Sequence, residues 1–196
     1  MSEDEVLMLS ELPAGALRAL LEPRGMRVQV VAPDAPIPGS YWGEREAGLI
    51  GDALYVRADT PVHSALHESC HFLCMDEHRR AQLHTDAGGD DVEESAVCYL
   101  QAVLADQLAG YSRERLFTDM DAWGYHFRLG STRAWFEQDS EDARAWLVAH
   151  GLVSLATHSS VGREVVLVLR QQRDELGMDE YLFASQLELL QNTDVA

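Results

Sequence analysis

Residues 59–75 read DTPVHSALHESCHFLCM and contain the pattern H-E-x-x-H at His67, Glu68 and His71. The Thr-Pro pair that begins at Thr60 is typical of a helix start, with the threonine as N-cap, so we expect a helix over most of this stretch. Side chains four residues apart lie one above the other on a helix, with Cβ atoms about 6 Å apart. Two imidazoles at this spacing can converge on one metal ion, so the pattern predicts a metal-binding helix.

The chemistry expected of this pattern is that of a catalytic zinc ion. Zinc bonds to imidazole nitrogen are about 2.0–2.1 Å long, and zinc makes a bound water molecule acidic. Glu68 lies on the flank of the histidine pair, where it can accept the proton of that water and later return it to a leaving amine. The residues between and beside the motif are uncharged, which favours a buried helix. The alternative is a buried helix whose histidines are satisfied by hydrogen bonds alone, with Glu68 at the surface.

A catalytic zinc site needs a third protein ligand, and a second helix, expected over residues 91–108, offers two glutamates. Glu93 shares its face with the apolar stripe of that helix, whereas Glu94 shares its face with Cys98 and Gln101. A buried carboxylate is costly unless it is paired or bound to metal, so we expect Glu93 to be the third ligand, with Glu94 as the second choice. The other candidates in this region are Asp90, Asp91 and His84.

Other residues near the motif have plainer explanations beside the functional ones. Cys74 lies one turn beyond His71, so a site of His67, His71 and Cys74 is conceivable, although one helix presents three ligands poorly to one ion. We expect the cysteines to be small buried residues instead. His63, one turn before the motif, is expected at the surface near the rim of the site.

Outside the motif, the sequence predicts a small sheet in the first third of the chain and helices after it. Apolar and turn-forming residues predict a helix over 13–21, a strand over 26–32, a loop over 33–43 and a strand region over 48–58 with a hairpin turn at Gly51-Asp52. Residues 112–151 are expected to be mostly helical with Gly151 ending the last helix, residues 163–169 to be a strand or a buried helical turn, and residues 179–190 to form a final amphipathic helix. The fold class is therefore α+β, with an antiparallel or mixed sheet packed on the H-E-x-x-H helix.

Composition limits the partners of the chain. Its 33 acidic and 15 basic residues give a net charge of −18, which repels phosphate backbones and anionic membranes, so we expect neither nucleic acid nor a membrane as a partner. No apolar stretch approaches the roughly 20 residues that span a bilayer, and the acidic N-terminus is unlike a secretory signal. The three cysteines, Cys70, Cys74 and Cys98, are typical of reduced thiols, which favours a cytoplasmic protein.

The order of these motifs resembles the gluzincin peptidases, in particular the compact ImmA/IrrE-like peptidases, over roughly residues 48–108. The likeness is carried by His67-Glu68-x-x-His71 and by Glu93, three residues before Ala96, in the second helix. It also extends to the membrane CaaX-processing metallopeptidases, but the missing membrane segments argue against that branch. The resemblance implies a zincin-like fold, a bound Zn²⁺ and hydrolysis of peptide bonds.

The resemblance also implies a tyrosine or histidine that stabilises the negative charge developing during attack on a carbonyl. Tyr125 and His126, in the aromatic-rich segment 122–128, are our candidates for this role, with core filling as the alternative. Tyr99 and Tyr111 remain possible.

We therefore expect one zincin-like domain over residues 1–196, with a metallopeptidase core at about 48–108 and a helical C-terminal part at 112–196. Its substrate would be a peptide or protein that pairs, in an extended conformation, with the strand at about 54–58. The acidic composition of the chain is compatible with a preference for basic peptides. The oligomeric state stays open. One alternative is a non-catalytic zincin scaffold with a structural zinc or a partner-binding role, which predicts a fourth protein ligand or a blocked cleft. Another is a helical interaction protein without metal, whose melting temperature chelators would leave unchanged.

Overall fold

Three short strands form a mixed sheet in the first part of the chain: β1 (Arg27–Val30), β2 (Gly48–Ile50) and β3 (Ala53–Val56). The computed structural model describes residues 6–157 and 163–166. The strand order is β1-β3-β2, with β1 parallel and β2 antiparallel to β3. The expected hairpin turn lies between β2 and β3, and the α+β class is confirmed with a mixed sheet.

The central position of β3 corrects one expectation. Because β1 pairs with one edge of β3 and β2 with the other, β3 has no free edge for an extended substrate. The outer edge of β2 is also partly paired, since Thr85 N donates to Leu49 O at 2.9 Å and Gly51 N donates to Leu83 O at 2.8 Å. The predicted pairing of a peptide with the strand at 54–58 is therefore wrong.

The N-terminal elements pack against this sheet. Helix α1 (Ala16–Leu21) begins three residues after the expected start at Pro13, because Gly15, with φ +79°, is its N-cap. Short 3-10 helices precede and follow it, at Leu9–Glu11 and Glu22–Arg24. The buried residues of α1 belong to the main hydrophobic core, together with Val28 of β1.

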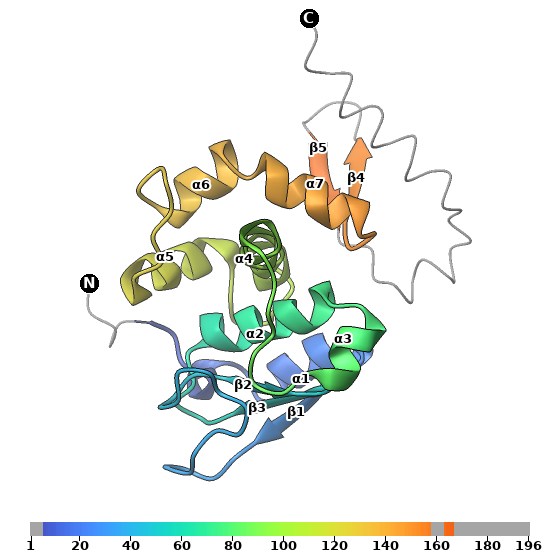
Figure 1. The fold of residues 1–196 in the computed structure, drawn as a ribbon. Helices are drawn as coiled ribbons and strands as arrows, with labels where there is room; N and C mark the ends of the chain where they lie inside the picture. The colour runs from blue at the N-terminus through green and yellow to red at the C-terminus, as the bar shows by residue number, and fades with distance from the viewer. Residues whose placement is uncertain (1–5, 158–162, 167–196) are drawn as a thin grey trace, which may run out of the picture.

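Helix α2 (Val62–Cys74) carries the H-E-x-x-H motif and lies directly on the sheet (Figure 1). It begins after Pro61, which is its N-cap in place of the expected Thr60; the Thr60 Oγ1 instead closes the preceding turn by accepting a hydrogen bond from Arg57 N at 2.9 Å. Eleven of its 13 residues are buried, and the two that are only partly buried, His67 and Glu68, belong to the motif. A hydrogen-bonded helix is the element that tolerates such burial, since it satisfies its own backbone groups.

The next two helices place a second wall beside α2. Helix α3 (Glu77–Gln82), which the sequence did not predict, is capped by the Asp76 side chain. Helix α4 (Asp91–Ala105) starts where expected and ends three residues before Leu108; the Asp90 side chain caps it by accepting from the backbone of its first turn. Figure 1 shows α4 between α2 below and the later helices above.

The remaining described residues are helical up to a short hairpin, as the sequence predicted for 112–151. They form α5 (Arg113–Trp123), α6 (Thr132–Gln138), α7 (Glu141–Ala149), β4 (Ser154–Thr157) and β5 (Arg163–Val166), with β4 and β5 antiparallel. The segment left open at 163–169 is a strand over 163–166, and the helix expected at 179–190 lies outside the described residues. Among the described residues, no helix combines the length and apolar character that crossing a membrane requires.

Candidate metal centre

Helices α2 and α4 bring three metal-ligating side chains to one point. The Nε2 atoms of His67 and His71 are 3.2 Å apart. Glu94 of α4 faces both: Oε1 lies 3.3 Å from His67 Nε2, and Oε2 lies 3.3 Å from His71 Nε2. The i,i+4 spacing on α2 therefore does what the pattern predicts, and α4 supplies the acid.

The three side chains fit a zinc ion on two grounds. Ligand atoms bound tetrahedrally at about 2.0–2.1 Å lie about 3.3 Å from one another, close to the separations of His67, His71 and Glu94. Burial also lowers the pKa of both imidazoles, with that of His71 reduced to about 3 by burial first and then by His67 and Arg79. The neutral imidazole is the form that binds metal.

Glu93, the glutamate preferred from sequence, lies elsewhere. Its buried carboxylate pairs with Arg79 of α3, with Nη1 2.8 Å from Oε1 and 2.9 Å from Oε2. The buried Glu93 carboxylate has a partner, as expected, but that partner is an arginine, and it is Glu94, the second choice from sequence, that faces the two histidines. The cue in the sequence was the polar stripe of Glu94, Cys98 and Gln101 on a helix that is otherwise apolar.

The polar stripe of α4 continues beside His67. A second grouping that is compatible with a metal consists of His67, Glu94 and Cys98. A ring nitrogen of His67, a carboxylate oxygen of Glu94 and the sulfur of Cys98 all lie within 4.8 Å of one another. Gln101 is fully buried, donates from Nε2 to the backbone oxygen of His63 at 2.7 Å, and lies close enough to His67 to raise the pKa of that imidazole, against the larger effect of burial. Cys98 is buried as expected, whereas its position beside His67 and the role of Gln101 were not predicted.

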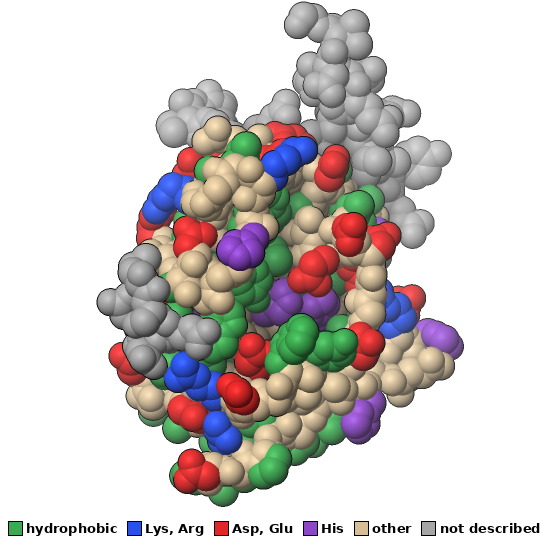
Figure 2. Space-filling view, turned by 60° about the vertical axis from the view of Figure 1, so that its left-hand side comes forward, with side chains coloured by type: hydrophobic (Ala, Val, Ile, Leu, Met, Phe, Trp, Pro, Cys, Tyr) green, Lys and Arg blue, Asp and Glu red, His purple; other side chains and the backbone are tan. Residues whose placement is uncertain are grey.

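The histidines open into a cleft with two adjoining lobes, which share His67, Glu68 and Trp42. The acidic lobe, of about 400 Å³, is bounded by the carboxylates of Glu68, Asp86, Asp90, Asp91 and Glu94. The aromatic lobe, of about 330 Å³, is bounded by Trp42, Glu46, His63, Trp123 and Tyr125. Figure 2 shows histidine side chains in the base of this hollow and acidic side chains around it.

Glu68 lies where the two lobes meet, as expected of a group that acts on a substrate. Burial first, and then the negative charges of Glu46 and Glu94, raise the pKa of its carboxyl to about 8. A carboxyl with this pKa exchanges a proton readily near neutral pH, which is the property required of a general base and acid.

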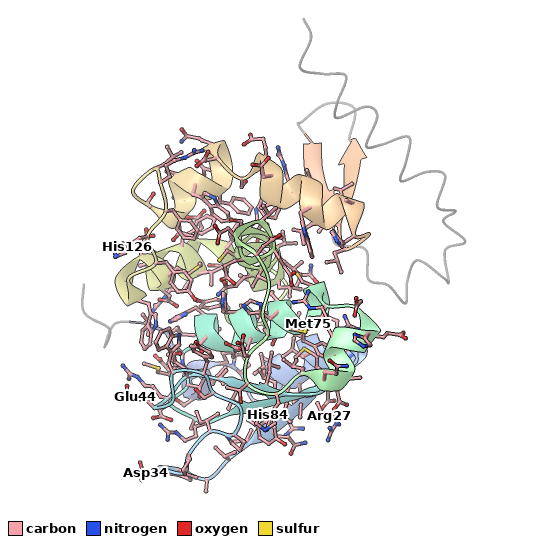
Figure 3. The ribbon with its side chains drawn as sticks, viewed as in Figure 1. Arg27, Asp34, Glu44, Met75, His84 and His126 are labelled. Atoms are coloured by element: carbon pink, nitrogen blue, oxygen red, sulfur yellow. The ribbon has the colours of Figure 1, made fainter. Side chains whose placement is uncertain are left out.

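The structure separates the two candidates Tyr125 and His126. Gly124, with φ +98°, ends α5 and lets the chain turn back, so that the Tyr125 ring lies 5.9 Å from that of His67. Burial raises the pKa of the Tyr125 hydroxyl, as do nearby acidic groups, which keeps it a hydrogen-bond donor. His126 is exposed and projects from the outer surface (Figure 3), so its predicted role in the cleft is wrong.

The remaining sequence candidates have other roles. His63 is not at the surface as expected, but 1% exposed beneath the aromatic lobe. Asp90 caps α4, and Asp91 and His84 are exposed. Cys74 is buried and is not part of the groupings around His67. Tyr111 donates to Asp119 at 2.7 Å, and Tyr99 stacks on Phe136.

Comparisons of the chain with models of known protein families, with curated proteins and with solved structures each found no match.

Proposed function

We propose that this protein is a zinc-dependent metallopeptidase with a zincin-like arrangement of helices. The observation that carries the proposal is the convergence of three side chains at an open cleft: His67 Nε2 and His71 Nε2 are 3.2 Å apart, and each lies 3.3 Å from one of the two oxygens of the Glu94 carboxylate. The sheet, the motif helix α2 on it and the ligand-bearing helix α4 support the zincin-like reading. The H-E-x-x-H pattern also brings Glu68 into that cleft.

Three side chains would hold the metal and one would move the proton. His67, His71 and Glu94 are the ligands; when bound, zinc would polarise a carbonyl and make water acidic. Glu68 would accept a proton from the attacking water and return it to the leaving amine, because it lines both lobes of the cleft beside His67. Hydrolysis of an amide such as a peptide bond is a reaction in which both transfers are needed.

Tyr125 is proposed as the group that stabilises the developing negative charge. Its ring contacts His67, and its raised pKa means that the hydroxyl keeps its proton. A protonated hydroxyl beside the reacting carbonyl donates a hydrogen bond to its oxygen, which is worth most when that oxygen carries charge. Tyr125 would therefore act on the transition state more than on substrate binding.

The test is the metal content and peptidase activity of the full chain and its variants. We expect about one zinc per chain in the wild type, lost in His67→Ala and Glu94→Gln but kept in Glu68→Gln and Glu93→Gln. The rate at which a mixed synthetic peptide library is cleaved, measured by mass spectrometry, should fall by about 10²–10⁴-fold in Glu68→Gln with its zinc in place. Zinc-loaded wild type that cleaves no peptide of the library would exclude the peptidase function.

A second candidate function is favoured by Cys98. If Cys98 joined the ligands, the coordination shell would close and the metal would be structural, as in a non-catalytic zincin scaffold. Cobalt substitution distinguishes the two functions, because a thiolate ligand adds intense near-ultraviolet absorption that nitrogen and oxygen ligands lack. We expect the spectrum and the metal affinity to be the same in wild type and Cys98→Ser. A thiolate band that disappears in Cys98→Ser would favour the structural metal.

A further inference from the structure

The aromatic lobe has walls suited to a long side chain. The rings of Trp42, Trp123 and Tyr125 line it, and Trp42 is 78% exposed at its mouth. An exposed tryptophan beside a buried active-site wall offers its ring face to whatever enters the lobe. The lobe adjoins Glu68, so a side chain held there belongs to a residue next to the bond that is acted on.

The base of the lobe contains a polar group that has no partner. His63 is 1% exposed, and neither of its ring nitrogens has a hydrogen-bond partner among the described residues. Its ring lies 5.0 Å from that of Trp123 and 6.0 Å from that of Tyr125, so aromatic rings hold it in place. A buried imidazole without hydrogen-bond partners is costly in free energy, and a ligand in the lobe could supply the missing partner.

The wall of the lobe also carries a carboxylate, that of Glu46. Its loop is fixed on α2 because Ala47 N donates to Ser64 Oγ at 3.0 Å. The Glu46 carboxylate accepts a hydrogen bond from Trp123, and burial together with Glu44 raises its pKa, which shows that its negative charge is poorly compensated. The nearby Arg45 stacks over Trp123, with its guanidinium carbon 5.5 Å from the ring centroid, but does not line the lobe.

The charges around the lobe select the sign of the ligand. Among the described residues, those that line the two lobes include several carboxylates but no lysine or arginine. A cation entering the cleft therefore meets carboxylates, aromatic ring faces and neutral imidazoles, with one positive charge, that of Arg45, set back over Trp123, whereas an anion meets the repulsion of the carboxylates.

We propose that the aromatic lobe binds the cationic side chain of a lysine or arginine in the peptide substrate, which rests on the proposed peptidase function. The charged end lies against the Glu46 carboxylate and donates a hydrogen bond to His63. The aliphatic stem lies between the rings of Trp42 and Trp123, which attract the cation as well. All 15 basic residues of the chain are arginines, so a lysine probe is chemically distinct from every side chain of the protein itself.

The test is a binding measurement that does not depend on cleavage. Heptapeptides of glycine and serine, blocked at both ends, carry at their centre lysine, norleucine or glutamate; norleucine matches the lysine stem without its charge. Each is titrated calorimetrically at low salt into chelator-treated full-length protein, in which no hydrolysis occurs. We expect the lysine peptide to bind about tenfold more tightly than the norleucine peptide, and the glutamate peptide more weakly than either.

Two variants with the same change of charge locate the effect. Glu46→Gln should reduce the preference for lysine over norleucine by about fivefold or more. Glu44→Gln, two residues away on the same loop and at the outer surface (Figure 3), should change it by less than about twofold. Circular dichroism of both variants shows that the fold is kept.

Equal binding of the lysine and norleucine peptides, no binding of either, or equal losses in the two variants would each overturn the proposal. Cleavage assays with the zinc-loaded protein separate this result from the proposed function. Cleavage without any preference for basic residues leaves a peptidase and removes the role of the lobe. Charge-dependent binding without cleavage of any peptide leaves the lobe and removes the peptidase.

Discussion

Arg79 Nη1 lies 2.8 Å from Oε1 of Glu93, and this ion pair between α3 and α4 fixes which glutamate faces the histidines. Gly89 makes room for the carboxylate, since a Cβ there would lie 3.2 Å from Glu93 Cδ. Consecutive helical residues are rotated by about 100°, so with Glu93 held on the side of Arg79, Glu94 turns toward α2. The arginine therefore contributes to the site without touching it.

Exchanging each glutamate for glutamine should separate stability from metal binding. Glu93→Gln leaves Arg79 without its charge partner, and because Arg79 is partly exposed we expect a loss of about 1–3 kcal/mol in the free energy of unfolding, with zinc retained. Glu94→Gln should change stability of the metal-free protein by less than about 1 kcal/mol, since that side chain is half exposed, but weaken zinc binding by more than about 100-fold. Urea unfolding and competition with a chromophoric chelator measure the two effects. The reverse pattern would return the ligand role to Glu93.

Gln101 should position His67 for metal binding. Its buried amide donates to the backbone oxygen of His63 on the same helix as His67 and raises the pKa of the His67 imidazole, so Gln101→Leu removes both interactions at nearly constant volume. Groups that orient a ligand histidine typically contribute about 10–100-fold to metal affinity, and we expect a loss in that range. Chelator competition at equal protein concentration measures it. An unchanged affinity, with the expected loss of stability, would reduce Gln101 to a structural residue.

Local patterns were sufficient to predict the elements around the motif. The Thr-Pro start, the Gly51-Asp52 turn and the β-branched runs each depend on neighbouring residues, so the motif helix and the strands lie within a few residues of their expected bounds. Helix α3 was missed because residues 77–82 carry almost no apolar stripe; its stability comes from the Asp76 cap and from contacts of Arg80 with the end of α2. Those contacts are tertiary and leave no periodic signal.

The candidate site, too, has one part that local sequence predicts and another that depends on tertiary contacts. His67 and His71 belong to one helix, so their convergence follows from spacing alone. Whether Glu93 or Glu94 completes the site depends on an arginine 14 residues earlier in the sequence, which no helical phase argument includes. The aromatic lobe joins Glu46 to Trp123, and the burial of His63 follows from that tertiary packing rather than from its own neighbours.

Acidification should destabilise the metal-free protein partly through His63. Burial, then the neighbouring His67 and Arg45, lowers the pKa of His63 to about 3 in the folded state, against about 6.5 when unfolded. Above pH 6.5 the His63 ring is neutral in both the folded and the unfolded protein, so its titration has no effect on stability there. Between pH 6.5 and 3 only the unfolded chain takes up the proton. The folded protein therefore loses stability as the pH falls through this range. Between pH 7.5 and 5 this single group should cost about 2 kcal/mol.

Urea titrations of wild type and His63→Gln at both pH values measure that contribution. Other groups titrate in both proteins, including His67 and His71, so the difference between the two slopes isolates His63. We expect the wild type to lose more stability than the variant over this range. Equal slopes would mean that the imidazole is charged or solvated in the folded protein.

Tyr125→Phe should lower kcat and leave KM nearly unchanged. The hydroxyl is proposed to bind the oxygen of the substrate only as charge develops on it, so its loss acts on the transition state and not on the ground state. We expect a fall in kcat of about 10–10³-fold with zinc content unchanged. Steady-state kinetics on one cleaved peptide test this. A rise in KM at constant kcat would make Tyr125 a residue of the substrate-binding wall instead.

Removing the metal should lower the melting temperature, because the site joins two helices that otherwise meet through side chains alone. The proposed ligands His67 and His71 come from α2 and Glu94 comes from α4, so zinc would bind the folded arrangement and not the unfolded chain. Free zinc at about 100 times its dissociation constant adds about 2.7 kcal/mol of stability, which corresponds to roughly 5–10 °C for a chain of this length. Calorimetry with and without chelator measures the shift, and Glu94→Gln is the matched control, in which chelator should have little effect. An identical melting temperature in both conditions would favour a helical interaction protein without metal.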